Sequence, residues 1–270
     1  MTNKIVFALA FVAALGVAGP AGTDVWDTAT TSNDNGNVTR NEITHGFSQV
    51  HDLGVQPGPV ADQDWYAIQQ QPWSSYEILC DGFTGDNSSG LSNSLQRVDP
   101  AGTALQDSFS YGTSLGFARS LRFKNDTSQS IANEYVRVAN APCGTSCDTA
   151  DQYRIRAWET TIAVPRYNNA GSQLTVLIIQ NPGGAFGVTG NASLWSTSGA
   201  PVTTVAFSVP PRNSTVINLA TVNGGAANGT SGSITITNDG RYGQLAVKAV
   251  ALEPSTGFSF DTPGQHKPVS

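Results

Sequence analysis

Short apolar runs separated by turn-forming clusters are the feature that most constrains how this chain can fold. Within residues 153–158, apolar and basic side chains alternate for most of the run, which is the period of a half-buried β-strand. Clusters of Gly, Pro, Asn and Asp, such as residues 99–102 and 238–240, separate the runs and favour tight turns. The pattern therefore predicts many short strands rather than helices.

The composition supports the same fold class. Charged residues make up 13% of the chain, about half the usual share of a soluble domain, and the Glu, Lys, Arg and Ala runs of long helices do not occur. Hydrophobic residues reach 39%, which is enough for packed cores in a chain of 270 residues. We therefore predict an all-β protein built as two β-sandwich domains.

The apolar runs form two groups, one on each side of residue 160. The predicted strands of the first group are residues 47–53, 64–69, 76–80, 94–98, 121–123, 134–138 and 153–158. Those of the second group are residues 174–179, 192–196, 202–209, 215–219, 233–237 and 244–252. The first sandwich is expected over residues 23–160, which begin with an irregular leader at residues 23–41. The second, over residues 161–270 with a C-terminal tail, has the size of an immunoglobulin-like sandwich.

Residues 1–22 have the pattern of a cleaved signal peptide. Lys4 precedes an apolar run at residues 5–18, and small residues crowd positions 18–22, where a signal peptidase can cut. The apolar run is too short for a comfortable membrane span. The sequence thus predicts a secreted or periplasmic protein of bacterial type, with no membrane span after the signal is removed.

The charge balance argues against two classes of partner. The net charge is −6, with 14 basic and 20 acidic residues, whereas nucleic-acid binding needs a basic face for the phosphates. An acidic, charge-poor surface gives no attraction to anionic lipid either. The zinc-protease, P-loop and dinucleotide motifs are absent from the sequence. No nucleic-acid partner and no organic cofactor are therefore expected.

Export would bring the three cysteines into an oxidising compartment, where disulfides can form. Cys143 and Cys147 lie in one turn-rich loop that is short enough to close on itself, so a local disulfide is the favoured interpretation. A redox pair or half of a metal site is the alternative, but no His lies nearby and the spacing is not Cys-x-x-Cys. Cys80 lies on a strand-like run and is expected to be a buried free thiol.

Residues 58–66, Gly-Pro-Val-Ala-Asp-Gln-Asp-Trp-Tyr, resemble the Asp-x-Asp-x-Tyr signature of bacterial pre-peptidase C-terminal-like domains. Residues 95–103, 135–138 and 153–156 are similar to later strands of that family, so the resemblance covers about residues 40–158. It implies a jelly-roll-like β-sandwich that often assists secreted peptidases. No peptidase domain accompanies it in this sequence, so the enzyme that such a domain usually assists is not part of this sequence.

The second half resembles a domain that accompanies such units in bacterial exported proteins. The matching stretches are residues 164–169, 239–243 and 248–254. This resemblance implies no activity.

Asp62 and Asp64 admit two interpretations. The pair is a candidate calcium site, since Ca²⁺ takes six to eight oxygen ligands and carbonyl groups lie nearby. Two carboxylates on one short turn are too few by themselves. The favoured interpretation is that both side chains shape the turn by accepting backbone N–H bonds, with no metal bound.

Residues 112–116 fit the Gly-x-Ser-x-Gly pattern of a nucleophile elbow, with Ser114 as the nucleophile. That elbow needs a helix after the serine, whereas residues 117–121 lead into another strand. The available general bases are His45, His51 and His266. A glycine-rich turn is the favoured interpretation, and a serine hydrolase that uses Ser114 is the alternative function.

Exposed aromatic side chains on a sandwich can stack on sugar rings. Trp65, Trp158 and Trp195 fall on predicted strands and are expected in the cores. Trp73 follows Pro72 in a loop and is the candidate surface aromatic. These patterns predict an exported, non-enzymatic binding or structural module, whose partner is an extracellular protein or glycan.

Overall fold

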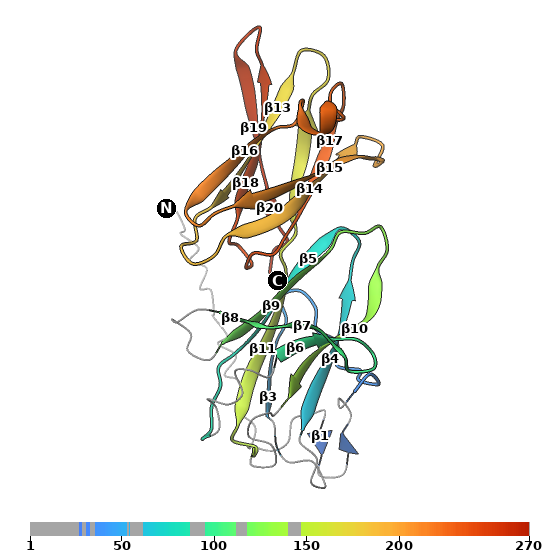
Figure 1. The fold of residues 1–270 in the computed structure, drawn as a ribbon, viewed down its shortest axis with the longest axis vertical. Helices are drawn as coiled ribbons and strands as arrows, with labels where there is room; N and C mark the ends of the chain where they lie inside the picture. The colour runs from blue at the N-terminus through green and yellow to red at the C-terminus, as the bar shows by residue number, and fades with distance from the viewer. Residues whose placement is uncertain are drawn as a thin grey trace, which may run out of the picture.

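Figure 1 shows a molecule that is almost entirely β-strand in the computed structural model, which confirms the predicted all-β fold class. The structure describes residues 27–28, 31–32, 36–52, 54, 62–86, 95–111, 118–139 and 147–269. The predicted signal peptide lies outside these residues. In the part of the chain that is described, no helix is long and apolar enough to cross a membrane.

The N-terminal strands build two antiparallel sheets that face each other. They are β1 (Asp27–Thr28), β2 (Thr31–Ser32), β3 (Ser48–Asp52), β4 (Gln63–Gln70), β5 (Ser74–Asp81), β6 (Leu95–Val98), β7 (Ala104–Asp107), β8 (Phe109–Ser110), β9 (Arg119–Asn125), β10 (Ile131–Ala139) and β11 (Gln152–Glu159). One sheet has the order β4-β10-β6-β7 and the other β3-β11-β5-β9-β8, while β1 and β2 pair separately. Inward side chains of both sheets, among them Tyr66, Leu121 and Tyr153, form one buried cluster.

The C-terminal strands build a second pair of antiparallel sheets. They are β12 (Ile162–Asn168), β13 (Leu174–Asn181), β14 (Val188–Ser196), β15 (Pro201–Val209), β16 (Asn213–Asn218), β17 (Ser231–Asn238), β18 (Ala246–Glu253), β19 (Phe258–Pro263) and β20 (Gln265–His266), with one 3₁₀ turn, η3 (Val222–Gly224). The sheet orders are β15-β14-β17-β12-β20 and β16-β13-β18-β19. Their inward side chains, among them Ile162, Leu177 and Ile236, form the second buried cluster.

Every strand predicted from an apolar run is present, and the alternation of side chains explains why. In β11 the inward residues Tyr153, Ile155 and Ala157 are buried, while Arg154 and Arg156 face outward. Cys80 is a buried free thiol in β5, as the sequence predicts.

The two sandwiches lie end to end along the long axis of the molecule, and the C-terminal segment returns to the junction between them (Figure 1). Thr160 and Thr161 connect β11 to β12 and are fixed against β5. The Thr160 hydroxyl donates to the Ser75 hydroxyl at 2.9 Å, and the Ser75 N–H donates to the Thr161 hydroxyl at 2.9 Å. The connection is therefore a hydrogen-bonded joint rather than an open linker.

A second set of contacts reaches across the junction from the turn after β9. Asp126 accepts a hydrogen bond from the Asn191 amide at 2.8 Å and another from the Thr237 hydroxyl at 2.5 Å. The ring of Trp73 meets the ring of Trp195 edge-on, with 5.3 Å between the centroids. Polar and aromatic groups thus tie the two sandwiches together.

Two of the tryptophans expected in the cores are elsewhere. Trp65 is buried as expected, but Trp158 and Trp195 are half-buried at the junction, where each stacks on or meets an aromatic ring of the other sandwich. Trp158 follows the inward-facing Ala157 in β11, so the strand period turns its ring outward. The prediction for these two residues was wrong because burial between domains cannot be separated from burial in a core by alternation.

Candidate functional site

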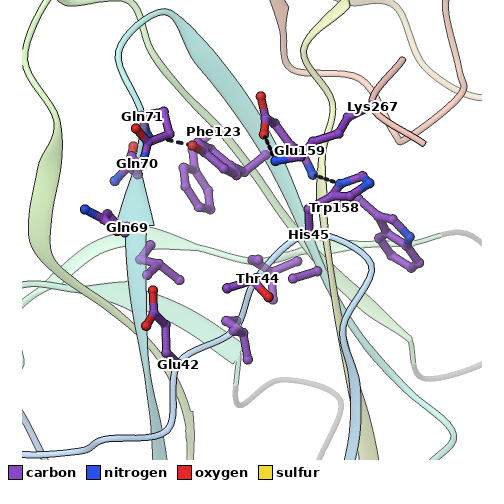
Figure 2. A pocket seen from close by; sticks show the side chains of 15 residues that line it. Glu42, Thr44, His45, Gln69, Gln70, Gln71, Phe123, Trp158, Glu159 and Lys267 are labelled. Atoms are coloured by element: carbon purple, nitrogen blue, oxygen red, sulfur yellow. Dashed lines mark hydrogen bonds and ion pairs between the residues drawn. The ribbon is translucent and has the colours of Figure 1, made fainter. Parts of the chain in front are cut away.

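A cavity of about 140 Å³ opens at the end of the N-terminal sandwich that faces the junction (Figure 2). Its floor is apolar and is made by residues of the first core, including Ile68, Ile78 and Phe123. Its rim is polar and is contributed by the segment before β3, the end of β4, the end of β11 and the C-terminal segment. The rim residues used below are Glu42, His45, Gln69, Gln71, Glu159 and Lys267.

Tyr76 connects the floor of this junction pocket to its rim. Its ring stacks on Phe123 with 5.6 Å between centroids, while its hydroxyl accepts the Gln71 N–H at 2.7 Å and lies 2.8 Å from the Ser74 hydroxyl. Burial, the largest cause, raises the pKa of Tyr76 above its ordinary value, so the hydroxyl keeps its proton in neutral solution. The side chain is a fixed wall of the pocket.

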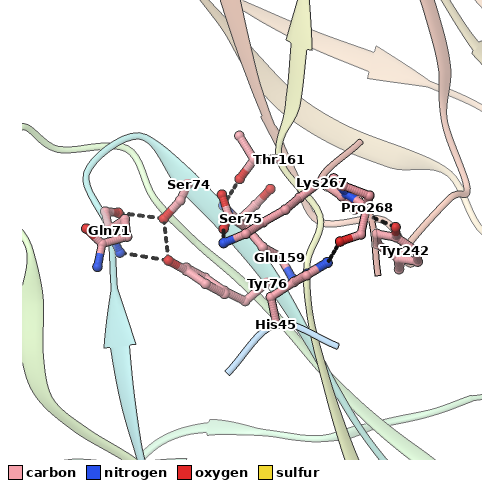
Figure 3. Close-up of polar contacts among 10 residues, drawn as sticks. All are labelled: His45, Gln71, Ser74, Ser75, Tyr76, Glu159, Thr161, Tyr242, Lys267 and Pro268. Atoms are coloured by element: carbon pink, nitrogen blue, oxygen red, sulfur yellow. Dashed lines mark hydrogen bonds and ion pairs between the residues drawn. The ribbon is translucent and has the colours of Figure 1, made fainter. Parts of the chain in front are cut away.

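His45 lies on the rim, and both ring nitrogens have backbone partners (Figure 3). Its Nδ1 accepts the N–H of Glu159 at 2.9 Å, and its Nε2 is 3.1 Å from the carbonyl oxygen of Pro268. A nitrogen that accepts carries no proton, so Nε2 must be the nitrogen that donates to Pro268. His45 is thereby held as the neutral Nε2–H tautomer between the two sandwiches.

The C-terminal segment closes one side of the pocket. The Lys267 ammonium lies 2.8 Å from the Glu159 carboxylate, and the Tyr242 hydroxyl donates to the Lys267 carbonyl at 2.6 Å. The Tyr242 ring also stacks on Trp158, with 6.1 Å between centroids. His45, Glu159 and Lys267 of the rim therefore take part in contacts that link the two sandwiches.

The size of the pocket decides what it can hold. Small-molecule sites usually span about 300–1,000 Å³, and this cavity of about 140 Å³ is well below that range. It admits a single side chain or part of one sugar ring. Within the described residues, no three His, Cys, Asp or Glu side chains gather in a way that could hold a metal ion.

The two aspartates singled out in the sequence lie at the opposite end of β4 from this pocket. Asp62 is buried, and its Oδ1 accepts the N–H of Gln63 at 2.9 Å. Asp64 is fully buried and accepts the hydroxyl proton of Tyr153 on the facing sheet. The residues that precede Asp62, from 55 to 61, lie outside the described part.

The other candidates from the sequence are scattered. Trp73 is half-buried because its ring packs against Trp195, and its backbone is left-handed with φ of 53°. Cys147 is buried, but Cys143 lies outside the described residues, so their pairing stays a prediction. Ser114 also lies outside them.

The rim of the junction pocket was not predicted from the sequence. His45 lies 114 residues before Glu159 and 223 before Pro268 along the chain, and each belongs to a different apolar run or tail. No local spacing signals such a meeting.

No family model and no curated protein sequence matches this chain. Among solved structures, a Bacteroides uniformis β-glucuronidase is similar at 12% identity and a TM-score of 0.19, over 76% of this chain and 26% of that enzyme. A β-glucuronidase from glycoside hydrolase family 2 is similar at 12% identity and a TM-score of 0.20, over 89% and 27%. The chain spans about a quarter of the length of these enzymes. TM-scores of this size define neither a shared family nor a shared activity.

Proposed function

We propose that the protein is an exported, non-catalytic binding or structural module whose partner is an extracellular protein or glycan. The proposal includes removal of residues 1–22 on export and a disulfide between Cys143 and Cys147. One observation carries the functional part: His45, Glu159 and Lys267, the ionisable side chains on this side of the pocket, are occupied by contacts that link the two sandwiches.

A general base needs a nitrogen that is available to a reacting group. Both nitrogens of His45 contact main-chain atoms, and Glu159 holds Lys267. His266, in β20, directs its Nε2 to the carbonyl of Leu245 at 3.1 Å. These contacts support a structural role for the imidazoles and a binding role for the surfaces that the joint fixes in place.

A fixed arrangement of two sandwiches favours binding because little conformational freedom is lost when a partner docks. The joint at Ser75 and the contacts of Asp126 restrain the sandwiches on different elements, so surfaces from both can meet one partner. The same rigidity suits a structural spacer in an extracellular assembly.

The test is a binding screen with the purified protein on an array of neutral and acidic glycans and on immobilised secreted proteins of the same cell. We expect saturable binding to one glycan or protein class. Asp126→Ala removes the contacts with Asn191 and Thr237 across the junction, and we expect it to lower the affinity of any partner that spans both sandwiches. Ester or peptide turnover that depends on Ser114, with no saturable binding, would favour the hydrolase alternative.

A further inference from the structure

A larger hollow, here called the arginine groove, lies where β8 and β9 meet the loops of the C-terminal sandwich. It has a volume of about 730 Å³, within the range of about 300–1,000 Å³ for ligand pockets. From the N-terminal sandwich it is lined by Phe109 and Arg122, and from the C-terminal sandwich by Phe186 and Asp239. An adjoining hollow of about 220 Å³ shares Phe186 and adds Tyr111 and Arg241.

The guanidinium of Arg122 lies over two aromatic rings. Its guanidinium carbon lies 5.2 Å from the centre of the Phe109 ring and 5.3 Å from the centre of the Phe186 ring. One of its N–H groups donates to the carbonyl of Asp239 at 3.2 Å, and its buried Nε has no partner among the described residues. Rings that cover the faces of a guanidinium leave its edge available for in-plane hydrogen bonds.

Arg241 brings a second guanidinium to the same place. Its guanidinium carbon lies 3.9 Å from the centre of the Tyr111 ring and 4.8 Å from the centre of the Phe186 ring. It also donates a hydrogen bond to the carbonyl of Tyr111. Two cations therefore lie against one phenyl ring, Phe186, in a protein whose net charge is −6.

Neither arginine forms an ion pair with a carboxylate in the described part of the chain. Asp239 and Glu77 lie nearby, and Glu77 interacts by charge with both guanidiniums, but the hydrogen bonds that each carboxylate accepts come from other groups. Asp239 accepts bonds from the N–H and the hydroxyl of Thr189 at 2.6 and 2.7 Å. Glu77 accepts bonds from the Ser120 hydroxyl at 3.1 Å and the Tyr242 N–H at 2.8 Å. Each guanidinium therefore has N–H groups beyond the one bound to a backbone carbonyl that can donate to a ligand.

We propose that the arginine groove binds a carboxylate-bearing glycan, with Arg122 and Arg241 taking its carboxylates and Phe109 taking the face of a sugar ring. The inference deepens the proposed function and rests on it. A guanidinium matches a carboxylate by two parallel hydrogen bonds, which a neutral sugar cannot accept with equal strength. Phe109 is 50% exposed, so its ring offers a flat apolar face beside those donors. A peptide made only of acidic residues would use the arginines but has no ring to lay on Phe109.

The experiment is calorimetric titration of the purified protein with a trimer of galacturonate, beside a neutral galactose trimer and a short polyglutamate peptide. We expect saturable binding of the uronate, weakened by salt, and no measurable binding of the neutral trimer. Arg122→Ala should bind the uronate about 10-fold to 100-fold more weakly, because a charge-assisted bond is lost. Arg122→Lys should also bind more weakly than the wild type, since lysine keeps the positive charge but cannot donate two parallel hydrogen bonds to one carboxylate.

Arg166→Ala is the matched control, because Arg166 lies 4.8 Å from the ring centre of Phe260 and lines neither hollow. It should bind the uronate like the wild type. Since Arg122 also contacts Asp239 across the junction, its variants are checked for an unchanged melting temperature. Phe109→Ala, on an exposed edge strand, is the second variant and should weaken binding about 3-fold to 10-fold with no change in folding.

Wild-type affinity in both Arg122→Ala and Phe109→Ala would overturn the inference, as would equal affinity for polyglutamate and the uronate. A wild-type protein that binds no uronate but binds another glycan or a secreted protein also overturns it, while leaving the proposed function standing. Hydrolysis of esters or peptides that requires Ser114 overturns the proposed function whatever happens at the groove.

Discussion

A chain of hydroxyl groups crosses the core of the N-terminal sandwich. The Tyr153 hydroxyl donates to Asp64, and a hydroxyl has one proton, so its 2.5 Å contact with the Tyr66 hydroxyl must be a bond that Tyr66 donates. Burial first, and then the charge of Asp64, raise the pKa of Tyr153 well above its usual value. Asp64 is therefore the final acceptor in this series of hydrogen bonds.

Removal of that acceptor should destabilise the fold. In Asp64→Ala the Tyr153 proton can turn toward Tyr66, but then the Tyr66 proton loses its place on Tyr153. We expect a loss of about 1–3 kcal/mol in the free energy of unfolding, measured by urea denaturation. Asp64→Asn keeps an acceptor oxygen and should recover part of the loss. Equal stability of Asp64→Ala and the wild type would contradict this account.

Glu77 gives a second prediction at this scale. Burial, outweighing the N–H of Tyr242 and the hydroxyl of Ser120, raises the pKa of its carboxyl above the ordinary value of 4.5. The folded protein then holds the Glu77 proton at a pH where the unfolded chain has released it. The contribution of Glu77 to the free energy of unfolding is therefore fully present below about pH 4.5, where the carboxyl is protonated in both states. This contribution is lost as the pH rises through the raised pKa of the folded protein.

The measurement is the free energy of unfolding of the wild type and of Glu77→Gln between pH 4 and pH 8. The other carboxylates contribute equally to both proteins, so the difference isolates Glu77. We expect the wild type to lose stability relative to Glu77→Gln as the pH rises from about 4.5. A difference that stays constant with pH would show that the pKa of Glu77 is not raised.

Among the strands, alternation was enough to locate the runs that bury one face, but some edge and irregular strands, such as β12 and β19, were missed. β12 contains Pro165, and its pairing with β17 changes register between Val164 and Tyr167. Proline cannot donate to a ladder, so it occurs in strands at bulges or edges and hides the strand pattern. β19 was taken as part of the tail because it is an edge strand with Phe258 exposed.

Gly232 tests how closely β17 approaches β14. It pairs with Ser196, and a Cβ at this position would lie 1.8 Å from the carbonyl oxygen of Trp195. Because that atom belongs to the backbone of a neighbouring strand, it cannot turn aside. Gly232→Ala should destabilise the protein by about 1–3 kcal/mol or more, seen as a lower melting temperature. Ser231→Ala is the control and should have little effect; equal effects would contradict the close approach.

At the scale of the whole molecule, the joint and its pocket could not be predicted from the sequence. The bond between Asp126 and Thr237 joins residues 111 positions apart, and the groups that meet at Tyr242 come from both sandwiches and the C-terminal segment. Alternation predicts which face of a strand is buried, but it does not say which domain covers the outer face. Arg122 and Arg241 were missed for the same reason.

The joint predicts energetic coupling between the sandwiches. Asp126→Ala and Thr237→Val each remove one partner of the same bond, so the double variant should lose less stability than the sum of the single variants. We expect a coupling of about 0.5–3 kcal/mol from denaturation of the three variants and the wild type. The pair Lys248→Ala and Asp261→Ala, an exposed ion pair within one sheet, is the comparison and should show at most about 1 kcal/mol. Additive effects at Asp126 and Thr237 would mean that this bond does not couple the sandwiches.

We propose that this molecule binds or supports a partner and catalyses no reaction. The most direct test is the rate of ester and peptide hydrolysis by the purified wild type and by Ser114→Ala, at protein concentrations high enough to detect slow turnover. We expect no hydrolysis above the buffer rate in either protein. The free energies of unfolding of the two proteins should differ by less than about 1 kcal/mol. Reproducible turnover in the wild type that disappears in folded Ser114→Ala would contradict this proposal.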